Sequence, residues 1–292
     1  MSRTSAFDAL PACAVGQSPA EELPAITVIG AGEMGIAVAA RLRDGGRSVV
    51  VSLEGRSDAS RRRAAARTIP IVETAGEAVA HADIVLSIVP PGQARQAAER
   101  IAAALRVTPK PLTYVDCNAV APDSVREIET TIRSAGAFFL DAGIIGGPPR
   151  PGEAGPIVFV SGERTAPAVA LRAAGLDVRV LGPAVGSASA LKMSYAGVTK
   201  GLTALCALMQ LHARKHGLGA ELDAVLAETR PDLWHFLAGA VPSMYPKAYR
   251  WIAEMREIAA YTAPDEAGER IYDGAARVYE QIVREAQTAK TG

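Results

Sequence analysis

The most constraining feature of this 292-residue chain is a short apolar run that leads directly into a glycine-rich turn. Residues 26–29 read Ile-Thr-Val-Ile, and Gly30, Gly32 and Gly35 follow with the spacing G-x-G-x-x-G before an amphipathic stretch over 36–43. Where a strand turns into a helix in this way, backbone amides and the positive end of the helix dipole face a pyrophosphate. The pattern therefore predicts a dinucleotide-binding unit.

Each position of the turn has an expected task. Gly30 makes the tight turn, Gly32 lets the backbone approach the pyrophosphate, and Gly35 lets the helix pack closely on the strand. Glu33 and Met34 lie between these glycines, and we expect them to contact the same dinucleotide. The alternative is a glycine-rich turn without a ligand, which the further strand and helix units make less favourable.

Short β-branched runs alternate with Ala-, Arg- and Glu-rich stretches as far as residue 183. This alternation is typical of βαβ units, so residues 25–183 are predicted to form an α/β domain with a Rossmann-type, doubly wound parallel sheet. Helices are expected to begin near Glu33, Ser57, Ala75, Gly92 and Pro122. The predicted strands cover 26–29, 48–53, 69–72, 84–89, 113–116, 138–141, 157–161 and 178–181.

No strand pattern follows Pro183, and the rest of the chain, 184–292, is predicted to be an all-helical domain. Residues 184–216 form one proline-free helical pattern, and prolines punctuate the helices after it. A helix of this length must bury its apolar face on another surface, which favours a homodimer. Residues 1–24 have no continuous apolar run, so we expect a mobile extension and not a secretory signal.

Composition excludes several classes of protein. Lysine plus arginine equals aspartate plus glutamate at 31 each, so no overall charge attracts nucleic acid or anionic lipid. No window approaches the roughly 18 uninterrupted apolar residues of a membrane span. Cys13, Cys117 and Cys206 are odd in number and far apart, which fits neither a disulfide framework nor a zinc site. We expect a cytoplasmic protein without a metal, a membrane or a nucleic-acid partner.

The strand predicted over 48–53 ends beside two opposed signals for the ribose of the dinucleotide. Glu54 could accept hydrogen bonds from the ribose hydroxyls of NAD, whereas Arg56 and Ser57 could hold the 2′-phosphate of NADP. The arginine run 61–63 adds positive charge, although such a run is also typical of a solvated helix face. NADP is the favoured cofactor, with NAD as the alternative.

Four segments resemble those of the β-hydroxyacid dehydrogenase superfamily, which includes 3-hydroxyisobutyrate and 6-phosphogluconate dehydrogenases and, as a divergent branch, imine reductases. They are the glycine turn at 30–35, Ser-Ile-Val-Pro at 87–90, Asp-Ala-Gly-Ile-Ile-Gly-Gly at 141–147, and Gly-Ser-Ala-Ser-Ala-Leu-Lys at 186–192. The resemblance implies an N-terminal Rossmann domain, a long interdomain helix, a helical domain used for dimerisation, and an active site in the cleft between the domains.

The resemblance assigns the catalytic acid/base to Lys192 on the interdomain helix. When a hydride reaches a carbonyl carbon, negative charge grows on the oxygen, and a nearby ammonium can stabilise that charge and supply the proton. The alternative is an ordinary lysine at the surface of a helix. The small residues Gly186, Ala188 and Ala190 would let the helix approach the cofactor closely, which favours the catalytic role.

Two departures from the family pattern fall on the substrate side. Ala196 stands one turn after Lys192, where hydroxy-acid dehydrogenases of the family carry asparagine. Ile145 stands where their substrate loop carries serine before a glycine pair, so a substrate carboxylate lacks a side-chain hydroxyl and the loop resembles the imine reductase branch. The predicted substrate contacts are Ile145, Gly146, Gly147, Lys192 and Ser194, with Tyr195 as a second catalytic candidate.

Weaker candidates lie elsewhere in the chain. Asn118 follows a predicted strand at the ligand-binding edge of the sheet, where it could contact the nicotinamide ribose or the substrate, or simply begin a turn. Val89 and Pro90 lie at the equivalent edge and are expected to line the cofactor path. His235 could reach the cleft as a substrate contact, although a lone histidine in an apolar segment is more often a core residue.

Three functions remain open at this point. The favoured one is an NADP-dependent dehydrogenase or reductase acting on a small-molecule carbonyl/alcohol pair. The second is an imine reductase, in which Lys192 matters less and Tyr195 donates the proton. The third is a catalytically silent cofactor-binding module, which Lys192 argues against because such a module has no use for a lysine in the cleft.

Overall fold

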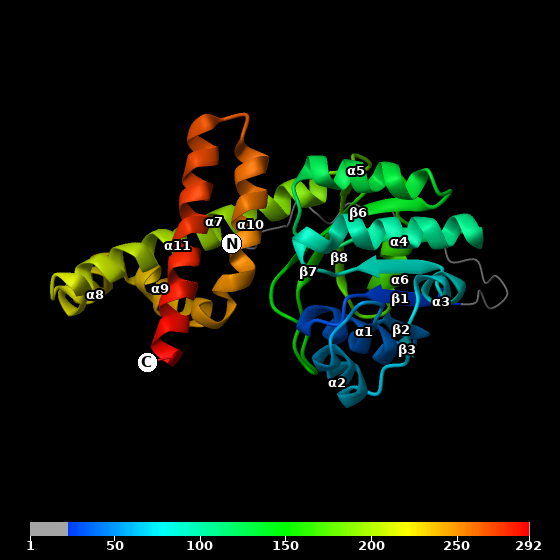
Figure 1. The fold of residues 1–292 in the computed structure, drawn as a ribbon, viewed down its shortest axis with the longest axis horizontal. Helices are drawn as coiled ribbons and strands as arrows, with labels where there is room; N and C mark the ends of the chain where they lie inside the picture. Colours follow the sequence, from blue (N-terminus) through cyan, green and yellow to red (C-terminus); the bar gives the residue numbers. More distant parts are fainter. Residues whose placement is uncertain (1–22, 292) are drawn as a thin grey trace, which may run out of the picture.

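The computed structural model describes the backbone of residues 23–291 and the side chains of residues 23–288. Almost all of the expected N-terminal extension, residues 1–24, lies outside the described residues, as does Cys13. Figure 1 shows a sheet covered by helices and, beside it, a group of helices that the long helix α7 (Ser187–Lys215) joins to the sheet.

Eight strands form one sheet in the order β3-β2-β1-β4-β5-β6-β7-β8. The first six run parallel, so the carboxyl ends of β1 and β4 meet at the point where the strand order reverses. In doubly wound sheets this point is the ligand-binding edge. The strands are β1 (Ile26–Ile29), β2 (Val49–Ser52), β3 (Ile71–Val72), β4 (Ile84–Ser87), β5 (Thr113–Asp116), β6 (Phe138–Ile145), β7 (Ile157–Ser161) and β8 (Asp177–Gly182).

Helices cover both faces of the sheet, and for this reason most of its strands are buried. The apolar positions of these helices recur at helical spacing, as in α4, where Ala94, Ala98, Ile101 and Leu105 are buried on one side. One face is covered by α1 (Glu33–Asp44), α2 (Asp58–Ala66) and α6 (Ala166–Ala173). The other is covered by α3 (Ala75–His81), α4 (Ala94–Val107), which the short 3₁₀ helix η1 (Pro91–Gln93) precedes, and α5 (Pro122–Arg133).

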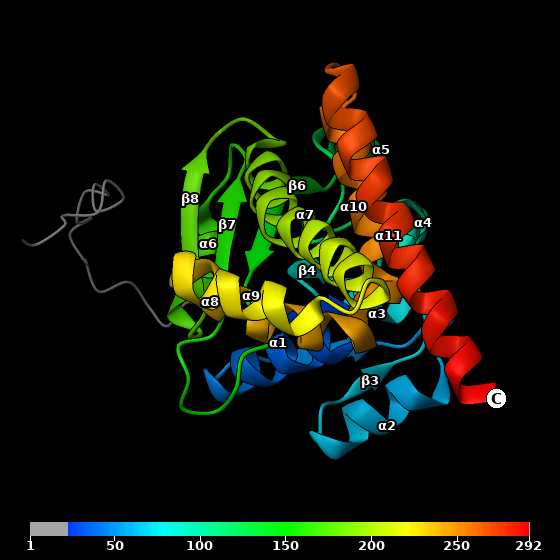
Figure 2. The same ribbon diagram turned by 90° about the vertical axis from the view of Figure 1, so that its left-hand side faces the viewer.

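The remaining helices form a second core around α7. α10 (Ala248–Thr262) and α11 (Glu266–Thr291) pack side by side and cross α7 (Figures 1 and 2). Met193, Met255 and Tyr279, one from each of these helices, are buried together. The region is completed by α8 (Gly219–Thr229), α9 (Pro231–Met244) and the short η2 (Tyr245–Lys247). Within residues 23–291, no helix is long and apolar enough to cross a bilayer.

The sheet differs in one respect from the fully parallel sheet that the sequence predicts. β7 runs antiparallel to β6, from Asp141 opposite Ser161 to Ile145 opposite Ile157, and β8 is parallel to β7. The reason is the connection over 146–156, which contains glycines and prolines but no helix, so the chain reverses instead of crossing over the sheet. β6 consequently extends beyond the predicted 138–141, because its last residues pair with β7.

Two helices also differ from expectation. α6 lies in a segment where the sequence analysis expects no helix. The long helix begins at Ser187 and not at residue 184, because Gly186 has a φ of +99°, a left-handed conformation outside the helical range.

Candidate active site

The glycine turn has the close contacts that only glycine permits. Gly30 has a φ of +118°, and a Cβ on it would stand 2.0 Å from the carbonyl oxygen of Ile88. A Cβ on Gly35 would stand 1.9 Å from the carbonyl oxygen of Gly30. Both distances are far shorter than a van der Waals contact, so β1, α1 and the end of β4 can approach one another only with glycine at these two positions.

Gly32 differs from its neighbours because its open side faces no protein atom. Nothing lies within 4 Å of the position that a Cβ on Gly32 would occupy. Gly32 is also the N-cap residue of α1, and because glycine has no side chain it leaves the amides of the first turn uncapped. Exposed Glu33 and half-buried Met34 begin that turn. Free amides, a helix dipole and open space beside a glycine fit the pyrophosphate of a dinucleotide.

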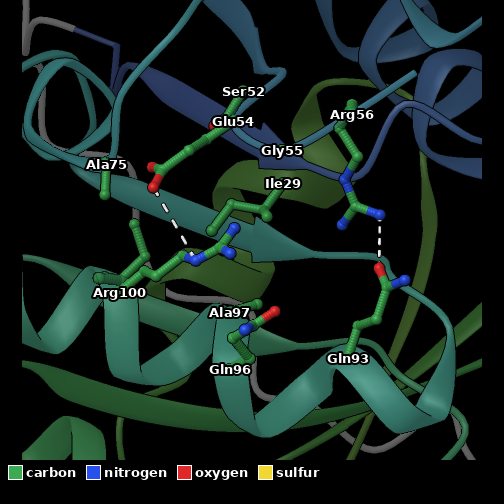
Figure 3. A pocket seen from close by; sticks show the side chains of 11 residues that line it. Ile29, Ser52, Glu54, Gly55, Arg56, Ala75, Gln93, Gln96, Ala97 and Arg100 are labelled. Carbon is green, nitrogen blue, oxygen red and sulfur yellow. Dashed lines mark hydrogen bonds and ion pairs between the residues drawn. The ribbon is translucent and has the colours of Figure 1, made fainter.

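A cavity open to solvent lies at the end of β2, where the adenosine ribose of a dinucleotide is expected (Figure 3). Its polar side chains are those of Ser52, Glu54, Arg56, Gln93, Gln96 and Arg100. The Arg56 guanidinium donates a hydrogen bond to Oε1 of Gln93, and burial, followed by the nearby Arg100, lowers the pKa of Arg56. Exposed Ser57 follows Arg56 in the chain, and its side chain makes no capping hydrogen bond to the start of α2.

The arginine run 61–63 does not reach this cavity. Arg61 forms an ion pair with Glu73, and Arg62 and Arg63 lie exposed on α2, outside the cavity lining. The run therefore has the character of a solvated helix face.

Asn118 ties the end of β5 to the end of β4. Its side chain is buried, its Oδ1 accepts a 2.7 Å hydrogen bond from the N–H of Val89, and its Nδ2 donates to Ser87 Oγ at 3.0 Å and to Asp116 Oδ2 at 2.9 Å. Both amide N–H groups are therefore engaged within the protein, and the side chain shapes the turn at Val89 and Pro90 in place of presenting a free donor to a ligand.

Lys192 lies on the first turns of α7, close to the end of β6. Its Nζ donates a 2.6 Å hydrogen bond to the carbonyl oxygen of Ile144. Gly143 makes this approach possible, since a Cβ there would stand 2.7 Å from the carbonyl oxygen of Ala188 and 3.0 Å from Cβ of Lys192. Burial is the main reason that the pKa of Lys192 falls to about 8; Lys200 lowers it further and Glu254 opposes the shift.

Comparisons with known proteins agree with this geometry. Residues 25–173 match the family described as the NAD binding domain of 6-phosphogluconate dehydrogenase, and residues 213–282 match a domain of unknown function, DUF1932. The chain belongs to the β-hydroxyacid dehydrogenase superfamily.

The solved structures similar to this chain include a protein of unknown function, a dehydrogenase and an imine reductase. The conserved protein MTH1747, of unknown function and structurally similar to 3-hydroxyacid dehydrogenases, is 30% identical, with 88% of this chain and 98% of that chain covered and a TM-score of 0.63. Mycobacterium tuberculosis 3-hydroxyisobutyrate dehydrogenase with L-serine is 22% identical, with coverages of 90% and 94% and a TM-score of 0.68. An imine reductase variant from Myxococcus stipitatus with NAD+ is 22% identical, with coverages of 91% and 94% and a TM-score of 0.57.

In the present chain, the buried carboxylate of Asp141 holds the start of α7 in place. Asp141 of β6 accepts hydrogen bonds from the N–H of Gly186 at 2.9 Å, from the N–H of Ser189 at 3.0 Å and from Ser189 Oγ at 2.7 Å. Ser161 of β7 adds a fourth at 3.1 Å. Burial raises the pKa of Asp141, while these donors oppose the shift. Asp141 lies in one of the family segments but has no role that is predictable from the sequence, and only the fold shows that it positions the helix that carries Lys192.

The structure brings some of the predicted substrate residues to Lys192. Ile145 ends β6 directly after Ile144, the residue whose carbonyl oxygen Lys192 contacts. Gly146 follows with a φ of +126°, packed against Pro156, and Gly147 is exposed. The region that the sequence analysis treats as a substrate loop is therefore a strand end followed by a turn.

The remaining candidates, Ser194, Tyr195 and His235, lie at three different places. The Ser194 hydroxyl lies 3.2 Å from the hydroxyl of Tyr261 on α10. Tyr195, three residues after Lys192, is its neighbour on the surface of α7 and is half-exposed. His235 is exposed on α9, which packs against α7, α8 and η2 at the end of the molecule away from the sheet (Figure 1). Tyr195 is thus beside Lys192 on α7, whereas Ser194 contacts Tyr261 and His235 is on a different helix.

An ion pair in the helical region was also not predicted from the sequence. Lys200, two turns after Lys192, pairs with Glu254 of α10 and lies 5.0 Å from the centre of the Trp251 ring. Both members of the pair are largely buried. The pair ties α7 to α10 and adds the two charges that act on the Lys192 pKa, so the electrostatics around Lys192 depend on both helices.

Proposed function

We propose that this chain is an NADP-dependent oxidoreductase that transfers a hydride between the nicotinamide and a small-molecule carbonyl/alcohol pair in the cleft between its two domains. The position of Lys192 carries this proposal. Its ammonium contacts Ile144 at the end of β6, beyond the sheet edge at which the glycine turn fits a dinucleotide. A proton donor and a cofactor site therefore meet at one edge of the sheet.

The chain's own residues would divide the work of this reaction. Bound nicotinamide supplies or accepts the hydride. The free amides of α1 and the space beside Gly32 hold the pyrophosphate. The hydrogen bond from the N–H of Val89 to the Asn118 side chain fixes the turn at Val89 and Pro90 along the cofactor path. Lys192 then donates a proton to the substrate oxygen during reduction and accepts one during oxidation, for which a pKa of about 8 is well suited.

The preference for NADP rests on the cavity at the end of β2. Arg56 is half-buried there and is held by Gln93, a neutral partner that leaves its charge available. Exposed Ser57 adds a hydroxyl beside it. A guanidinium and a hydroxyl at this position match a 2′-phosphate.

A second candidate is reduction of a C=N bond. It is favoured by the apolar residues near Lys192, because Ile145 and buried Ala196 give a substrate carboxylate no side-chain donor. In that reaction an iminium nitrogen loses positive charge, so an ammonium nearby contributes little. Tyr195, three residues after Lys192 and therefore its neighbour on the surface of α7, would be the proton donor of that reaction.

We propose further that the protein is a homodimer of the reducing cytoplasm, in keeping with its free Cys117 and Cys206. The support for a dimer is an exposed apolar stripe along α7, here called the α7 stripe, which consists of Tyr195, Val198, Leu205 and Met209. Its face lies opposite the side of α7 that packs into the protein's second core. An obligate pair would bury more than about 2,000 Å² over this surface.

Cofactor oxidation with a panel of substrates tests the proposed function. Wild-type protein is mixed with NADPH or NADH and with short 3-oxo acids and aldehydes, bulkier apolar ketones, and cyclic imines. We expect turnover with NADPH and a bulky apolar carbonyl, and little with short acids, because Ile145 offers their carboxylate no hydroxyl. Turnover of imines alone would establish the second candidate, and binding of NADPH without any turnover would establish a silent module.

A further inference from the structure

We propose that Arg100 of α4 is a second ligand of the 2′-phosphate of NADP, and that Glu54 is its partner in the absence of that phosphate. The competition between Glu54 and the phosphate for Arg100 would then set the choice between NAD and NADP. This inference rests on the proposed use of a nicotinamide dinucleotide, and it extends the cofactor site to a helix that the sequence analysis leaves out.

The backbone at Gly55 brings Arg100 to the end of β2. Gly55 has a φ of +68°, and a Cβ on it would stand 3.3 Å from Nη1 of Arg100 and 3.8 Å from Nη2. The guanidinium therefore lies against the turn between Glu54 and Arg56. Figure 3 shows Arg56 and Arg100 reaching the same cavity from two elements, the turn after β2 and the helix α4.

The charges around the cavity do not balance. Two guanidinium groups, Arg56 and Arg100, line it with one carboxylate, Glu54, and the remaining polar side chains, Ser52, Gln93 and Gln96, are neutral. The two arginines repel each other, since Arg100 contributes to the lowered pKa of Arg56. A dianionic phosphate between them would remove this repulsion and bind through charge-assisted hydrogen bonds.

The ion pair between Glu54 and Arg100 is weak enough for a phosphate to replace the carboxylate. Arg100 Nε and Glu54 Oε1 lie 3.8 Å apart, longer than a hydrogen bond, and their side chains are 41% and 36% exposed. Exposed pairs of this kind contribute little to stability. Glu54 released from Arg100 could accept hydrogen bonds from the ribose hydroxyls of NAD, whereas beside a 2′-phosphate its carboxylate is repelled.

Calorimetry with two nucleotide fragments tests the inference without requiring turnover. The probes are 2′,5′-ADP and 5′-AMP, which differ only in the 2′-phosphate, so the ratio of their dissociation constants reports that group alone. The variants are Arg100→Gln, Arg56→Gln and Glu54→Gln. The matched control is Arg62→Gln, which removes an equal charge from exposed α2 outside the cavity.

We expect the wild type to prefer 2′,5′-ADP, and Arg100→Gln and Arg56→Gln each to reduce that preference about tenfold. Glu54→Gln should increase it by about threefold, and Arg62→Gln should leave it within about twofold, because exposed charges at a distance are screened.

Two results would overturn the inference in distinguishable ways. If Arg56→Gln loses the preference but Arg100→Gln behaves like Arg62→Gln, the NADP proposal stands and Arg100 is not a phosphate ligand. If the wild type binds both fragments equally, the preference for NADP and the role of Arg100 fail together, whatever the outcome of the substrate panel.

Discussion

The two halves of the molecule bury their apolar surface in different ways. In the half that contains the sheet, helices cover both faces, and the cores on the two sides contain fully buried side chains such as Leu86 and Tyr114. In the helical half, α7 buries one side against α10 and α11, while on the α7 stripe Val198 is 67% exposed and Leu205 56% exposed. The first half thus buries its sheet under its own helices, whereas the second leaves an apolar stripe exposed, which is the surface of the proposed homodimer.

The largest effect that this difference predicts concerns association. Leu205→Glu would place a carboxylate in the middle of the α7 stripe, and burying that charge should weaken a homodimer by about 10² to 10³-fold. Light scattering and sedimentation over a range of concentrations measure the change. Val107→Glu is the matched control, because Val107 is an isolated, 83% exposed valine at the end of α4 and should leave association unchanged. A wild-type protein that is monomeric at micromolar concentration would break the comparison.

The next effect concerns the joint between the halves. Asp141→Asn replaces an acceptor of four hydrogen bonds with a group that is a donor on one side, so one or two buried donors at the start of α7 lose their partner. The free energy of unfolding should fall by about 2 to 3 kcal/mol.

Urea titration followed by circular dichroism measures the stability of this variant, with exposed Asp123→Asn of α5 as the control. If Asp141 also positions Lys192, the kcat of the variant should fall while its affinity for NADPH stays near that of the wild type. Unchanged stability and unchanged kcat would show that α7 is held by its other contacts with the sheet.

The smallest effect is a pH dependence at the same joint. In the proposed reaction the ammonium form of Lys192 donates the proton for reduction, and burial lowers the pKa of Lys192 from 10.5 to about 8. Above pH 8 that form is lost, so kcat for carbonyl reduction should fall about tenfold per pH unit, while alcohol oxidation should rise up to pH 8 and then level off. Steady-state rates in both directions from pH 6.5 to 9.5 measure the profile, and a reduction rate that stays flat through pH 8 would remove Lys192 from the proton transfer.

The cofactor half of the molecule could be predicted from sequence because its signals are local. The spacing of Gly30, Gly32 and Gly35 after an apolar strand is contained in ten residues, and the contacts at Gly30 and Gly35 explain why glycine is needed there. The long helix was predictable for a similar reason, since an uninterrupted helical pattern without proline precedes Lys215.

What the sequence could not supply are contacts between residues far apart in the chain. Arg100 meets the turn at Gly55, and Asp141 meets the start of α7, only because the strand order places their elements together. The direction of β7 depends on a loop whose glycines and prolines do not by themselves distinguish a reversal from a crossover. Asn118 shows the same limit, because its position at the sheet edge was predictable and its engagement with Ser87 and Asp116 was not.

The most direct measurement of the central claim is the kcat of Lys192→Met for carbonyl reduction, with the dissociation constant of NADPH determined on the same preparation. Methionine matches the unbranched lysine side chain as far as Cε and lacks the ammonium, so the contact with Ile144 and the proton donor are lost while the glycine turn is untouched. We predict that kcat falls by about 10² to 10⁴-fold and that NADPH affinity changes by less than about twofold. A kcat within about threefold of the wild type would contradict the assignment of Lys192 as the acid of this reaction.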